Sequence, residues 1–87
     1  MKKLTEVIEV EDAGLISLLG QRVTFMCGVY FYTGKLIGVN ETCVELEDAG
    51  VVFDTGAFDN KTWSDCQNLP SNWFVQIANI ESFGVLK

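Results

Sequence analysis

The sequence contains no histidine and few positive charges. Histidine is the commonest general base near neutral pH, so its absence disfavours many hydrolases. Six lysine and arginine residues stand against twelve aspartate and glutamate residues, which gives a net charge of -6. A protein that coats nucleic acid by neutralising phosphates needs the opposite sign. Any contact with nucleic acid is therefore expected to be local.

The three cysteines follow no familiar structural pattern. Cys27, Cys43 and Cys66 are odd in number and include no C-x-x-C pair, so neither a disulfide framework nor a zinc site is expected. No cofactor or metal is predicted. The uncharged run of residues 23–34 is far shorter than the ~20 apolar residues that span a bilayer. Residues 1–6 lack the apolar segment of a signal peptide, so a cytoplasmic location without membrane contact is expected.

The composition predicts one folded domain over residues 1–87. Hydrophobic residues make up 48% of the chain and charged residues 21%, which is too apolar for a disordered segment. A monomer of this size buries only about 60–65% of its extended-chain surface. The apolar surplus therefore favours burial against other subunits, and a homo-oligomer is expected.

Hydrophobic spacing predicts a short helix near the start of the chain. Residues 1–10 are expected to form an N-terminal arm or a strand. The leucines of residues 15–19 fall at helical spacing, between Asp12 as a capping residue and Gly20 as a helix-ending residue. We expect one amphipathic helix of two or three turns.

Alternation of apolar and polar residues predicts about five strands after this helix. The expected strands cover residues 21–27, 29–39, 42–47, 73–77 and 80–83. Gly34 and Gly38 fall on the same face of the second expected strand, so the backbone can bend sharply where these side chains are missing. Residues 48–50 are expected to turn. Residues 49–72 are expected to form an enlarged loop, in which 51–53 form a short strand or extend the preceding hairpin.

Two blocks of residues resemble a known family. Residues 18–23 have the sequence LLGQRV, residues 32–40 have YTGKLIGVN and residues 45–49 have ELEDA. Together, over residues 15–49, they resemble the first conserved block of Sm-like (Sm/LSm) proteins, the group that includes bacterial Hfq. Residues 75–83, VQIANIESF, are similar to the second block.

The resemblance implies a fold, an assembly and a ligand. The fold is a short helix and a strongly bent five-stranded antiparallel sheet that closes into a small barrel. Exposed strand edges pair between copies and make a homo-oligomeric ring of about five to seven subunits. The ligand implied is single-stranded RNA, possibly DNA, which gives the chain a role in RNA or nucleic-acid processing.

The implied nucleic-acid site comes from two loops. Asn40 stands where the family has an aspartate, Thr42 and Cys43 stand about where it stacks and recognises a base, and Gln76 falls near its Arg-Gly pair. Asn79 can also hydrogen-bond a base edge. This chain departs from the family in having no aromatic or methionine platform, no asparagine in register and no arginine there. Asparagine is equally typical of turns, and glutamine of strand ends.

The aromatic residues offer a further candidate. Most of these rings are expected in the core or in a subunit interface. Trp63, in the enlarged loop, is the ring we single out as a possible stacking platform for a base.

Two other functions stay open. A structural or protein-interaction ring without nucleic-acid binding would use its acidic faces, and negative loops near the pore would favour it. Asp54-Thr55-Gly56 resembles the catalytic triplet of retroviral-type aspartic proteases, in which two chains share a proton between paired aspartates. Only 31 residues follow Gly56, too few for the rest of such a fold. We therefore expect a non-enzymatic protein with no catalytic residue.

Overall fold

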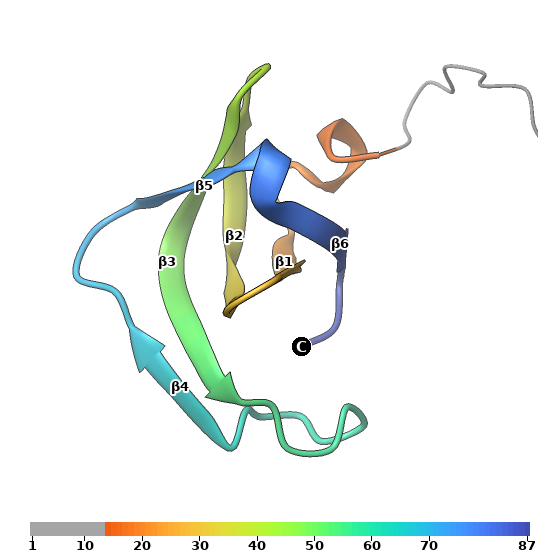
Figure 1. Cartoon of the computed structure of the whole chain (residues 1–87), viewed down its shortest axis with the longest axis vertical. Coiled ribbons are helices and arrows are strands. Elements are labelled where there is room, and N and C mark those ends of the chain that lie inside the picture. Colours follow the sequence, from red (N-terminus) through yellow and green to blue (C-terminus); the bar gives the residue numbers. More distant parts are fainter. Residues whose placement is uncertain (1–13) are drawn as a thin grey trace, which may run out of the picture.

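The computed structural model of the chain describes residues 14–87 and is mainly β (Figure 1). The expected N-terminal arm and Asp12 lie outside the described residues. The elements are η1 (Ile16–Leu18), β1 (Arg22–Cys27), β2 (Phe31–Val39), β3 (Cys43–Asp54), β4 (Asp65–Asn68), β5 (Trp73–Gln76), η2 (Ile77–Asn79) and β6 (Ile80–Gly84), where η marks a 3-10 helix. In the described chain, no helix is long and apolar enough to cross a membrane.

The strands form one bent antiparallel sheet in the order β4-β3-β2-β1-β6. β5 pairs with the first part of β3, beside β4, which pairs with the last part. The prediction of a mainly β, antiparallel fold is confirmed. The strand count differs, because residues 14–87 contain six strands instead of the expected five. The sheet is also not closed, because neither β4 nor β5 pairs with β6.

The expected amphipathic helix is wrong within the described residues, where only the three-residue η1 forms. Gly14 and Gly20 both adopt positive φ values, +73° and +87°, so they interrupt helical backbone on either side. Gly20 N–H donates to the Leu36 carbonyl at 2.7 Å, and Leu36 N–H donates to the Gln21 carbonyl at 2.9 Å. These bonds to β2 hold the end of the segment extended. A single turn is all that fits between the two glycines.

The expected turn at residues 48–50 is also wrong, because β3 runs through it. Thr33 pairs with Gly50 and Lys35 pairs with Glu47, so two residues of β3 lie opposite Gly34 alone. The first of these two, Asp48, has a positive φ of 52°. This is a β-bulge, which bends the strand without ending it.

The enlarged loop is consequently smaller than expected. Residues 49–54 belong to β3, and β4 forms a strand inside the predicted loop. Residues 55–64 connect β3 to β4, and residues 69–72, which contain Pro70, connect β4 to β5. Residues 51–53, expected to form a short strand or to extend the preceding hairpin, form the last part of β3.

The core lies on the inner face of the bent sheet. Its fully buried side chains come from β1, β2 and β3: Val23, Phe25, Leu36, Val44 and Leu46. Val75 of β5 adds to the same cluster, and residues of η1 and η2 pack against it. The core therefore extends to β5, which contains the predicted site residue Gln76.

Candidate binding clefts beside β5

Asn40 builds the turn between β2 and β3. Its Oδ1 accepts hydrogen bonds from the Thr42 backbone N–H at 2.8 Å, the Thr42 hydroxyl at 3.2 Å and the Cys43 backbone N–H at 2.8 Å. Asn40 N–H also donates to the Cys43 carbonyl at 3.0 Å. An asparagine whose side chain accepts hydrogen bonds from the backbone two and three residues further on is common in turns. The side-chain oxygen is therefore engaged within the turn.

β5 brings the second predicted loop against this turn. Gln76 pairs with Cys43 across the two strands, and Ile77 N–H donates to the Thr42 carbonyl at 2.9 Å. The structure thus brings four of the five predicted site residues together. Three of them line a hollow of about 740 Å³, which we call the turn hollow. Its lining is Glu41, Thr42, Cys43, Phe74, Gln76, Ile77 and Ala78.

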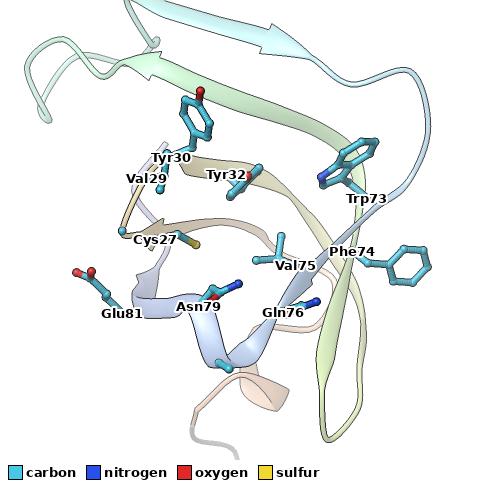
Figure 2. A pocket seen from close by; sticks show the side chains of 12 residues that line it. Cys27, Val29, Tyr30, Tyr32, Trp73, Phe74, Val75, Gln76, Asn79 and Glu81 are labelled. Carbon is cyan, nitrogen blue, oxygen red and sulfur yellow. The ribbon is translucent and has the colours of Figure 1, made fainter.

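Asn79, the fifth predicted residue, lies on the other side of β5. There a second depression of about 600 Å³ opens between β5 and η2 on one side and the β1–β2 turn on the other. We call it the seam cleft, because it occupies the unpaired gap of the sheet (Figure 2). Its lining is Cys27, Gly28, Val29, Tyr30, Tyr32, Trp73, Phe74, Val75, Gln76, Ala78, Asn79 and Glu81.

The seam cleft combines aromatic rings, amides and one carboxylate. Figure 2 shows Val75 and Asn79 pointing into the cleft, whereas Phe74 points away from it. Glu81 is the only charged residue in the lining. Its Oε1 lies 3.5 Å from the place where a Cβ on Gly28 would stand, which puts the carboxylate beside the β1–β2 turn.

Glu81 also affects the thiol inside the cleft. Burial raises the pKa of Cys27, and the Glu81 carboxylate raises that pKa further. Both effects favour the neutral thiol over the thiolate.

The positive groups of the described chain lie elsewhere. Arg22 pairs with Asp48 at 3.1 Å on the surface, and no lysine or arginine lines either depression. Lys87 Nζ donates to the carbonyls of Thr55, Ala57 and Thr62 at 2.9, 2.9 and 3.1 Å. Both depressions therefore carry acidic groups alone.

Lys87 changes the interpretation of Trp63. Its Nζ lies 4.6 Å from the centre of the Trp63 ring, a cation–π contact. This face of the ring is covered by the chain itself. The contact joins the end of the chain to the loop of residues 55–64, and no sequence pattern signals it.

The Asp54-Thr55-Gly56 triplet forms a local turn. Asp54 Oδ1 accepts a hydrogen bond from Gly56 N–H at 3.0 Å, and Gly56 has a φ of +64°. In residues 14–87, no group of three or more cysteine, aspartate and glutamate side chains is placed to hold a metal ion.

Comparison of the chain with protein-family models, with curated proteins and with solved structures found no match. The site must be argued from its own residues. Sequence reasoning missed Tyr32, Trp73 and Glu81 as a group, although each lies in or beside a predicted strand. These residues come together only because β5 pairs with β3 and β6 pairs with β1, which places them around the same gap in the sheet. Knowledge of these two pairings would have been needed to find the group.

Proposed function

We propose that the chain is a non-enzymatic, Sm-like subunit that assembles with copies of itself into a ring. The observation that carries the proposal is the pair of free sheet edges in residues 14–87. β6 pairs only with β1, whereas β4 and β5 pair only with β3. Free edges present unpaired N–H and C=O groups that another chain can satisfy.

Three further features support this proposal. The bent antiparallel sheet is of the kind that the family resemblance implies, and its open edges leave its closure to neighbouring copies. Both free strands carry exposed aromatic side chains, Phe74 on β5 and Phe83 on β6. The two edges differ in sequence, so pairing runs head to tail, and such contacts close into a ring when the rotation between subunits allows it.

The charge around the clefts favours protein over nucleic acid as the ligand of this ring. Glu41 and Glu81 are the charged residues in the two linings, and a phosphate backbone would be repelled there. We therefore propose a protein-interaction role. Binding of single-stranded RNA or DNA is the second candidate, favoured by the aromatic and amide groups that share the seam cleft.

Light scattering on the purified chain tests the assembly. The expected mass is that of about five to seven subunits. Phe74→Lys places a charge on the free strand β5 and is expected to reduce the mass to that of a monomer. Phe58→Lys is the matched control, since Phe58 is 55% exposed and Phe74 60%, but lies in the loop between β3 and β4. A monomeric unsubstituted chain would contradict the proposal.

Fluorescence anisotropy with labelled oligo-U and oligo-A at low salt separates the two ligand classes. Protein interaction alone predicts no binding of either oligonucleotide. If an oligonucleotide binds, and the double variant Gln76→Ala/Asn79→Ala binds it more weakly, nucleic-acid binding is established as the function. These two amides are chosen because both line the seam cleft.

A further inference from the structure

The seam cleft has an aromatic side and an acidic end. Trp73 of β5 and Tyr32 of β2 supply rings, and Glu81 of β6 supplies a carboxylate at the opposite end (Figure 2). Cys27 and Val75 lie between them in this view, and Val75 is only 5% exposed. The cleft therefore offers an apolar path that ends at a negative charge.

This combination suits a positive group with an apolar stem. The rings offer apolar surface to the methylene stem of such a side chain, and the carboxylate at the other end attracts its charged group. Gln76 and Asn79 add amide oxygens that accept hydrogen bonds from N–H donors. No cationic side chain lines the cleft, and the whole chain carries a net charge of -6. The Glu81 carboxylate would attract a positive ligand at short range, and the net negative charge of the chain would attract it at long range.

We propose that the seam cleft binds an arginine side chain presented by a basic segment of a partner protein. The aliphatic stem of arginine can pack on the rings of Tyr32 and Trp73, and its guanidinium group can pair with the Glu81 carboxylate. A guanidinium group also has enough N–H donors to bond a carboxylate and an amide oxygen together. This inference rests on the proposed protein-interaction function and is independent of ring assembly.

The test uses the full chain with Trp63→Phe, in which Trp73 is the only remaining tryptophan. It is titrated with a blocked glycine–arginine–glycine peptide and with the citrulline analogue, which has the same shape and no charge. The arginine peptide is expected to change Trp73 emission saturably. The citrulline peptide is expected to bind at least about threefold more weakly.

Two variants locate the binding. Glu81→Gln is expected to weaken the arginine peptide by roughly two- to fivefold, the effect of one exposed ion pair. Glu47→Gln removes the same charge from an exposed position of β3 outside the cleft, and is expected to leave binding unchanged. Added salt is expected to weaken the arginine peptide more than the citrulline peptide.

The outcomes separate this inference from the proposed ring. Equal binding of the two peptides, or equal effects of Glu81→Gln and Glu47→Gln, would overturn the arginine site. Displacement of the arginine peptide by oligo-U would assign the cleft to nucleic acid instead. Light scattering on the same samples reports assembly separately: a monomer that binds the arginine peptide supports the cleft and contradicts the ring.

Discussion

Gly34 lies at a close approach of β2 to β3. A Cβ at this position would stand 3.0 Å from Leu46 Cβ and 3.2 Å from both Ala49 Cα and the Glu47 carbonyl oxygen. Two of these three atoms belong to backbone, which cannot rotate aside. Gly38, by contrast, would meet Glu45 at an ordinary 3.5 Å. The two glycines, equivalent in the sequence pattern, therefore differ in the structure.

The first prediction compares these two positions. Gly34→Ala is expected to lower the free energy of unfolding by about 2 kcal/mol, because the core of the sheet must shift to admit a methyl group. Gly38→Ala is expected to change it by less than about 1 kcal/mol. Urea unfolding at one fixed subunit concentration measures both. Equal losses in the two variants would mean that the close approach at Gly34 has no special cost.

Cys27 supports a second prediction at the same scale. Its pKa is raised by burial and, to a smaller extent, by Glu81. The folded state thus holds the thiol proton to higher pH than the unfolded chain does. The resulting stabilisation is complete below the unfolded pKa and is lost as the pH rises through the folded pKa.

Glu81→Gln is expected to lower the pKa of Cys27, while burial keeps it above its ordinary value. The pH midpoint for alkylation of Cys27 by iodoacetamide then moves downward, as measured by mass spectrometry of the peptides. Cys66 is the internal control, because burial, Arg22 and Asp65 shift its pKa and Glu81 does not. Equal movement at both cysteines would contradict a local effect of Glu81.

Among the elements, the loop of residues 55–64 is held by a single side chain from the end of the chain. Lys87 joins three carbonyl oxygens and the Trp63 ring of this loop. Lys87→Met keeps the length of the side chain and removes the ammonium group. We expect chymotrypsin to cut the loop roughly threefold faster, because local opening becomes easier.

The matched control for this third prediction is Lys61→Met, an exposed lysine of the same loop. It removes the same charge and no contact with Trp63, so the cutting rate is expected to stay unchanged. Global stability is expected to fall by less than about 1 kcal/mol in Lys87→Met. Identical cutting rates for the two variants would show that Lys87 does not hold the loop.

Prediction from sequence worked best for elements whose pattern is local. The alternation over β1 and β6 placed both strands correctly, since each face of a strand differs in polarity. The prediction failed at Asp48, where a turn was expected and a β-bulge is present. A residue with positive φ is found in both, and pairing with the neighbouring strand determines which of the two forms. The prediction failed again at η1, where bonds from Gly20 and Gln21 to β2 override the helical spacing of the leucines.

At the scale of the whole molecule, strand pairing determines the candidate site. The sequence indicated two loops, around Asn40 and Gln76, and pairing of β3 with β5 does bring them together. Asn79 faces a different depression, because η2 turns the chain toward β1. The seam cleft depends on two strand pairings between distant segments, β3 with β5 and β1 with β6. Such contacts leave no local pattern, so this part of the site was beyond sequence reasoning.

The two free edges of the sheet have a consequence for mixtures of copies. A subunit whose β5 edge is blocked still offers an intact β6, since the two strands lie at opposite ends of the sheet. In the proposed assembly it would join an unaltered neighbour on one side and accept none on the other. One such copy would act as a terminator, so that a minority of altered subunits could leave most of the population as open fragments.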